Sequence, residues 1–121
     1  MISEVRDIMH ELSIAYSMLE IALDHARQAQ ASEIREIELE IGELAGVIPE
    51  SLEFCFEAVC KDTVAEGSCL SLKLVPAVGV CEDCRNVFKP DSAFALCPEC
   101  SGMKIRLDQG KEMRVKSIVV D

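Results

Sequence analysis

Apolar residues recur three or four positions apart between residues 9 and 30, which is the spacing of one helix face. These apolar residues are Leu12, Ala15, Met18, Leu19, Ala22 and Ala26. Because an α-helix has about 3.6 residues per turn, they form one stripe along a helix of about twenty residues. The polar and small residues 28–32 mark its end. We therefore predict an amphipathic helix over residues 9–30.

The next segment alternates between apolar and acidic residues. The alternating positions are Ile37, Leu39 and Ile41 on one side and Glu36, Glu38 and Glu40 on the other. Successive side chains of a strand point to opposite faces of its sheet, so this pattern predicts a strand with one packed and one wet face. The carboxylates are more simply a solvated surface than a metal site, because nothing brings three of them to one point.

A second helix and further strands are predicted after residue 48. Pro49 suits the first position of a helix, where no N–H partner is needed. The apolar stripe of this helix comprises Leu52, Cys55, Phe56 and Val59. A strand follows in which the alternating apolar residues are Leu70, Leu72 and Leu74. We also expect a short strand over residues 103–107, a hairpin-type turn at residues 108–111 and a final strand over residues 113–120.

Two Cys-x-x-Cys motifs, Cys81/Cys84 and Cys97/Cys100, are separated by twelve residues. Each motif can offer two thiolates to one ion, and four sulfur ligands at tetrahedral corners suit Zn²⁺. Four protein ligands leave no open position for water, which indicates a structural rather than a catalytic site. The alternatives are two disulfides or one redox-active pair. Zinc is preferred, because paired motifs in a reducing compartment more often bind a metal.

These patterns predict an α/β fold of the α+β type, with a small three-stranded sheet, two helices and an inserted zinc-ribbon-like lobe built on the four cysteines. The last strand resembles the two earlier ones, so we expect it to join their sheet. The expected domains are an α/β domain of residues 1–76, completed by residues 111–121, and a zinc-binding domain of residues 77–110.

Composition and charge narrow the classes of partner. A hydrophobic content of 50% argues against disorder, no apolar run approaches a membrane span, and the N-terminus lacks the apolar core of a secretory signal. We therefore expect a soluble, cytoplasmic protein. A net charge of −10 predicts repulsion from phosphate backbones and anionic membranes, hence neither a nucleic-acid nor a membrane partner. The cysteines outside the motifs are expected to be reduced and mostly buried: Cys55, Cys60 and Cys69.

Three blocks of sequence point to a known family. They are Met9-His10-Glu11-Leu12-Ser13, Ile41-Gly42-Glu43-Leu44-Ala45-Gly46-Val47 and the two Cys-x-x-Cys motifs. Together they closely resemble the HypA (HypA/HybF) family of nickel metallochaperones for hydrogenase maturation. The resemblance runs from Met9 to the C-terminus, with the blocks in the family's order and at its spacing.

The resemblance implies a non-enzymatic carrier of Ni²⁺ with a structural zinc site. In the family the chain begins at Met-His-Glu, and nickel is held by the imidazole with neighbouring backbone nitrogens, including the terminal amine. The corresponding residues are Met9, His10 and Glu11, with His10 as the main ligand. The resemblance thus implies that the α/β domain of residues 1–76 is the nickel-binding domain. A square-planar nitrogen set suits Ni²⁺ and differs from the tetrahedral thiolates that suit zinc. The implied partners are a GTPase, the large-subunit precursor of a nickel–iron hydrogenase and a second copy of the chain.

Eight residues precede Met9 in this sequence, which departs from the family pattern. With these residues present, the terminal amine lies far from His10, and a nickel site depends on His10, Glu11 and nearby amides. With Met9 as the first residue, the amine is available, and we expect this second arrangement. The other histidine, His25, is expected on the polar face or near the end of the same helix.

Two other function classes compete with the carrier. A zinc-ribbon nucleic-acid or transcription-associated binding module would need a basic surface near the cysteines, whereas the chain is strongly acidic. A thiol oxidoreductase would need an active thiol that holds no metal. Salt-dependent nucleic-acid binding would support the first, and one tightly held zinc would count against the second.

Overall fold

The computed structural model describes residues 2–92 and 95–121, with residues 2–8 described as backbone only. By their internal contacts the residues form two compact units. Unit 1 consists of Met1–Glu40, Val47–Lys73 and Arg114–Asp121, and unit 2 consists of Ile41–Gly46 and Leu74–Met113. The functional domain limits expected from the sequence stay a prediction. In the described part of the chain, no helix is long and apolar enough to cross a membrane.

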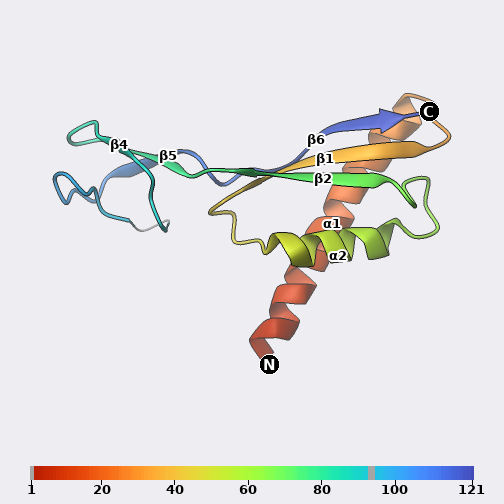
Figure 1. The fold of residues 1–121 in the computed structure, drawn as a ribbon, viewed down its shortest axis with the longest axis horizontal. Helices are drawn as coiled ribbons and strands as arrows, with labels where there is room; N and C mark the ends of the chain where they lie inside the picture. Colours follow the sequence, from red (N-terminus) through yellow and green to blue (C-terminus); the bar gives the residue numbers. More distant parts are fainter. Residues whose placement is uncertain (1, 93–94) are drawn as a thin grey trace. The chain divides into compact units, whose positions relative to one another are not determined.

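Unit 1 contains two helices and most of a three-stranded sheet (Figure 1). Its elements are α1 (Ile2–Gln28), β1 (Ile34–Gly42), α2 (Pro49–Cys60), β2 (Cys69–Val75) and β6 (Met113–Val120). The strand order is β2-β1-β6, so the last strand of the chain joins the sheet beside the first. The predicted α+β fold with two helices and a three-stranded sheet is confirmed.

Helix α1 begins at Ile2, which is earlier than the predicted start at residue 9. The reason lies in the sequence, because Ile2, Val5 and Met9 extend the apolar spacing of three or four residues toward the N-terminus. Helix α2 has Pro49 in its first turn as expected. The fixed φ angle of proline suits the first turn of a helix. Its missing N–H has no cost there, because the first N–H groups of a helix have no partner within it.

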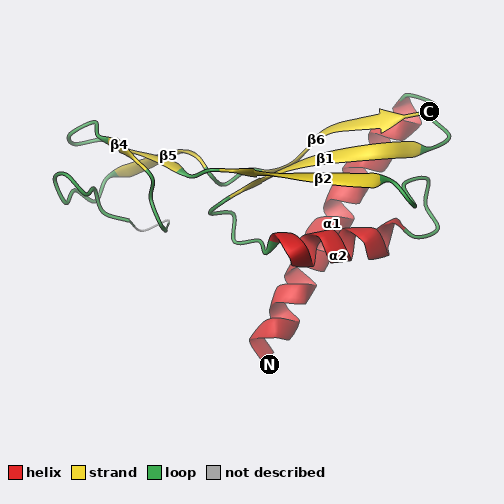
Figure 2. Cartoon of the chain, viewed as in Figure 1, coloured by secondary structure: helices red, strands yellow, loops and turns green. Residues whose placement is uncertain are grey.

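The core of unit 1 lies between the helices and one face of the sheet (Figure 2). The fully buried residues of β1 in this unit are Ile34, Ile37 and Leu39. The buried apolar side chains of the helices are Ile14, Ala15, Met18, Leu19, Ala22 and Ala26 in α1 and Leu52, Cys55, Phe56, Val59 and Cys60 in α2. The other sheet face carries charged residues, so both helices pack on the apolar face and contact each other.

The sequence suggested that the acidic face of β1 is simply solvated, but the structure shows that its carboxylates also bind neighbouring side chains. Glu40 is buried, and Arg114 Nε of β6 donates a 2.7 Å hydrogen bond to its Oε1. This bond, together with the Arg114 charge, holds the pKa of Glu40 below its ordinary value despite the opposing effect of burial. Farther along, Ser117 Oγ donates to Glu38 Oε2 at 3.2 Å. The carboxylates therefore tie β1 to its neighbouring strand.

Unit 2 contains a second three-stranded sheet of the order β4-β3-β5. Its strands are β3 (Val78–Cys81), β4 (Val87–Phe88) and β5 (Ile105–Gln109), and both pairings are antiparallel. The predicted hairpin-type turn at residues 108–111 is wrong, because β5 and β6 belong to different sheets. Gly110, with a φ of 122°, instead lets the chain pass from one sheet to the other.

Three backbone segments of unit 2 meet at two glycines. A Cβ on Gly42 would lie 2.1 Å from the carbonyl oxygen of Gly110, and a Cβ on Gly110 would lie 2.7 Å from Ala77 Cα. Two hydrogen bonds fasten the meeting point, from Gly42 N to Glu112 O at 2.7 Å and from Leu44 N to Gly110 O at 2.7 Å. Only residues without a side chain allow so close an approach.

Candidate metal centre

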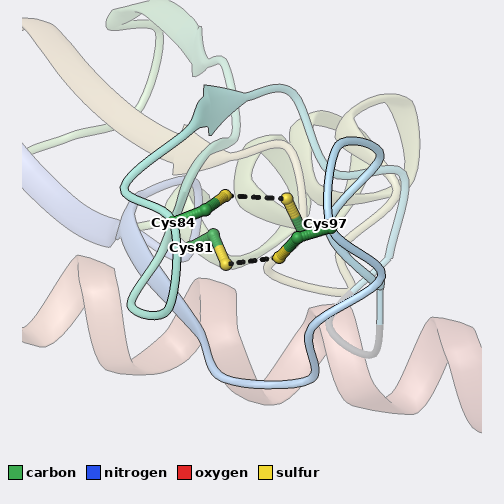
Figure 3. A group of neighbouring side chains, drawn as sticks. Cys81, Cys84 and Cys97 are labelled. Atoms are coloured by element: carbon green, nitrogen blue, oxygen red, sulfur yellow. Dashed lines mark hydrogen bonds between the residues drawn. The ribbon is translucent and has the colours of Figure 1, made fainter.

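The four cysteines of the two motifs converge in unit 2 (Figure 3). Their sulfur atoms all lie within 4.8 Å of one another. The Sγ atoms of Cys81 and Cys100 are 3.6 Å apart, and those of Cys84 and Cys97 are 3.5 Å apart. A tetrahedral ion with metal–sulfur bonds of about 2.3 Å would place its sulfurs about 3.8 Å apart. The donor set therefore fits zinc in both chemistry and spacing.

Both motifs adopt the same backbone turn. The N–H of the residue after the second cysteine donates to the carbonyl of the first, from Arg85 to Cys81 at 2.7 Å and from Ser101 to Cys97 at 2.8 Å. The N–H of each first cysteine donates to the carbonyl five residues later, at 2.9 and 3.1 Å. Arg85 and Ser101 have φ values of 66° and 60°. This left-handed conformation is unfavourable for residues with a side chain. The hydrogen bonds of the turns stabilise it here.

Hydrogen bonds to sulfur prepare the cluster for a cation. Glu99 N and Asn86 Nδ2 lie 3.4 and 3.9 Å from Cys97 Sγ. Burial raises the pKa of Cys97, but the N–H groups of Cys100 and Glu99 outweigh it and lower the pKa to about 6. The Gly102 N–H lowers the pKa of Cys100, yet the neighbouring thiols raise it to about 12. One sulfur is thus readily ionised, and binding a cation would release the remaining thiol protons.

Gly102 lies against the sulfur cluster. A Cβ at this position would be 2.8 Å from Asp83 Oδ2, 3.1 Å from Cys100 Sγ and 3.4 Å from Cys81 Sγ. An alanine two residues after Cys100 would therefore require the Asp83 side chain to move and would crowd the Cys100 sulfur. The sequence motifs do not reveal this close contact, and the glycine at that position was the available signal.

The seven cysteines form no disulfide, and among the described residues the three outside the motifs do not form a second metal-ligating cluster. Cys55 and Cys60 are buried as expected, whereas Cys69 is exposed on β2. Burial raises the pKa of Cys60 to about 11, and burial and the Glu11 carboxylate raise the pKa of Cys55. These two thiols are therefore poor nucleophiles.

The residues expected to hold nickel lie on α1 in unit 1. Met9 is 61% exposed and His10 is exposed, whereas Glu11 is only 1% exposed and faces Cys55 in the core. The structure therefore does not bring these three side chains together. His25 lies exposed in the last turn of the same helix, as expected. Within the described residues, the only group of metal-ligating side chains is that of the four motif cysteines.

The block of residues 41–47 holds unit 2 together through Glu43. Glu43 Oε2 accepts a 3.2 Å hydrogen bond from Ala77 N, and Glu43 Oε1 lies 3.2 Å from Lys89 Nζ. Lys89 belongs to the segment between the two cysteine motifs. The sequence pattern marked this block only by its resemblance to the family and did not reveal these two contacts of Glu43.

Comparison with known proteins places this geometry in a family. The family model described as "Hydrogenase/urease nickel incorporation, metallochaperone, hypA" matches residues 9–120. The hydrogenase maturation factors HypA of Chlorobaculum parvum and Geobacter sulfurreducens are each 42% identical over 113 residues, which cover 93% of this chain and 100% of each relative. The solution structure of the Ni metallochaperone HypA from Helicobacter pylori is similar with a TM-score of 0.68 and 27% identity, covering 91% of this chain and 96% of that one.

Proposed function

This chain belongs to the HypA family of metallochaperones for nickel incorporation, and we propose that it carries Ni²⁺ during maturation of a nickel–iron hydrogenase. The observation that carries the proposal is the family match over residues 9–120, which includes the Met-His-Glu block and both cysteine motifs. The family description names metal incorporation, and a carrier needs donor groups for its cargo but no catalytic residues. The role proposed for the chain is therefore non-enzymatic.

We assign Zn²⁺ to Cys81, Cys84, Cys97 and Cys100. The four sulfurs lie within 4.8 Å of one another in unit 2, and the segment between the motifs has few apolar residues to stabilise it otherwise. Binding of structural zinc contributes about 10–16 kcal/mol in small zinc modules, because the site forms only on folding. The ion thus stabilises the lobe rather than taking part in chemistry.

We assign Ni²⁺ to His10, with Met9 and Glu11 supplying backbone nitrogens. The imidazole is exposed and the family match begins at residue 9, whereas the Glu11 carboxylate lies in the core. The first four N–H groups of a helix have no partner within it, so they are accessible to a ligand. In a chain that starts at Met9, the terminal amine and the amides after it occupy this position.

The proposed partners are a GTPase that acts in nickel insertion and the large-subunit precursor of the hydrogenase, with homodimer formation as a further expectation. Relatives named hydrogenase maturation factors support a role among such proteins. A cytoplasmic location goes with this proposal, because thiolate zinc ligands stay reduced there. The nucleic-acid alternative is not favoured, because the chain has a net charge of −10.

The test is a Ni²⁺ titration by calorimetry, with zinc quantified in parallel, on chains starting at Met1 and at Met9. His10→Ala should abolish nickel binding while zinc content and the circular dichroism spectrum stay unchanged. His25→Ala is the matched control, because it removes an exposed histidine from the same helix. If His10→Ala and His25→Ala bind nickel equally well, the assignment is wrong. If zinc is lost together with nickel, the two-site arrangement is wrong.

A further inference from the structure

A cavity of about 560 Å³ opens in unit 1, and none of the residues assigned to either metal lines it. It lies between the second half of α2, the loop of residues 61–68 and the start of β2. Its floor is apolar, formed by the buried Phe56, Cys60 and Ala65 with the half-buried Leu70. The raised pKa of the Cys60 thiol keeps this floor uncharged at neutral pH.

The rim of the cavity is acidic. The exposed carboxylates of Glu53, Glu57 and Glu66 line it, and Lys61 is its only basic lining residue. Glu66 accepts a hydrogen bond from Asp62 N at 3.3 Å, whereas no ion pair involves Glu53 or Glu57 within the described part of the chain. The rim therefore carries a net negative charge.

The placement of Glu53 and Glu57 is unfavourable for the isolated helix. Like charges four residues apart on one helix face repel each other. The helix dipole makes the C-terminal end negative, and Lys61 at the C-cap is the one basic residue placed to offset Glu57, which leaves Glu53 without a basic residue near it on the rim. Such a local conflict is typical of a functional surface, because a bound cation would relieve it.

We propose that this cavity binds an arginine side chain from a basic segment of a partner protein. The aliphatic part of arginine would pack against Phe56 and Leu70, while its guanidinium would reach the rim carboxylates. A second copy of this chain is a poorer occupant of this acidic cavity than a basic partner, because its own net charge is −10. The proposal is independent of either metal.

The test is a titration of ¹⁵N-labelled full-length chain with the peptide acetyl-Ala-Arg-Ala-Ala-Arg-Ala-amide, followed by NMR. Amide shifts should concentrate in residues 53–70 and saturate. A peptide with citrulline in place of arginine has the same shape without the charge, and it should cause no such shifts. A peptide with the short cation diaminopropionate should bind at least fivefold more weakly, because it cannot reach the cavity floor.

Two double variants separate the cavity from general attraction by an acidic protein. Glu53→Gln with Glu57→Gln should weaken binding of the arginine peptide about fivefold and leave thermal stability equal or higher. Glu20→Gln with Glu36→Gln changes the net charge equally at exposed positions outside the cavity, and it should leave binding within twofold. Equal weakening by both pairs, or shifts scattered over the surface, would overturn the proposal. So would self-association, measured by sedimentation, that only the first pair abolishes.

Discussion

Replacing Gly42 by alanine should strongly destabilise unit 2, because the new methyl group would meet backbone rather than a side chain. The Cβ would lie 2.1 Å from the Gly110 carbonyl oxygen, so the two backbones must separate by about 1 Å to reach ordinary contact. That separation would break the two 2.7 Å hydrogen bonds that fasten the meeting point. Lost bonds of about 1 kcal/mol each, added to overpacking of about 1–3 kcal/mol, give a loss of about 3–5 kcal/mol.

Gly46 provides a matched control within the same block. Its φ is 77° and no atom lies within 4 Å of a Cβ built there, so alanine would be strained but not crowded. The left-handed conformation costs about 1–2 kcal/mol for alanine, and reduced freedom of the unfolded chain returns about 0.4–1 kcal/mol. Gly46→Ala should therefore lower the free energy of unfolding by no more than about 1.5 kcal/mol.

The assay is urea unfolding of both zinc-loaded variants, followed by far-ultraviolet circular dichroism, since the chain has no tryptophan. Zinc retention, measured with a colorimetric chelator after partial unfolding, reports on unit 2 specifically. A loss for Gly42→Ala that is no larger than the loss for Gly46→Ala would refute the argument, because the close approach would then be absent in solution.

Three further outcomes follow from the contacts described above. Cys97→Ser should abolish tight zinc binding, because it removes one of four ligands; zinc quantification after dialysis checks this. Gly102→Ala should weaken zinc binding about fivefold to thirtyfold by crowding the sulfurs, which competition with a chelator measures. Because the Glu40 pKa is lowered by Arg114, the pair stabilises the fold above the ordinary pKa of 4.5, and that contribution disappears as pH falls through the lowered pKa. In Arg114→Leu, the free energy of unfolding should therefore decrease less as the pH falls below 4.5 than it does in the unaltered chain. Urea unfolding at each pH measures this difference.

Local patterns predicted the elements of unit 1 well, because each depends on nearby residues. The stripe ending at Ala26, the proline at position 49 and the alternation around Leu39 all act within one helix or strand. The cluster of four cysteines was identifiable for a similar reason, since two short motifs already pair them. The membership of β6 in the first sheet was predicted from its likeness to the earlier strands.

Features that depend on distant residues could not be predicted. From the sequence pattern, Glu40 is expected to be exposed to solvent. The strand order places Arg114, 74 residues later, beside it, and the two side chains form a hydrogen bond. The split of β5 and β6 between two sheets reflects the contacts of Gly110 with Ala77 and Leu44, which lie far away in sequence. Cys69 was expected to be buried because cysteine is a small apolar residue. It lies on β2, at the edge of its sheet, and its side chain is exposed.

The length of α1 should control nickel affinity, because nickel and the helix compete for the same backbone nitrogens. With α1 beginning at Ile2, the amides near His10 lie inside the helix and donate to carbonyls four residues earlier. Freeing three of them would break three hydrogen bonds of about 1 kcal/mol each, which weakens nickel binding about a hundredfold. A chain that starts at Met9 has no such bonds to break and adds the terminal amine.

The chain starting at Met9 should therefore bind Ni²⁺ at least about a hundredfold more tightly than the chain starting at Met1, with equal zinc content in both. Calorimetric titration at pH 7.5 measures the difference, and acetylation of the Met9 amine serves as the control that removes the amine while keeping the length. Equal affinity of the two chains, still dependent on His10, would show that backbone nitrogens contribute nothing. The imidazole and other side chains would then have to account for the whole site.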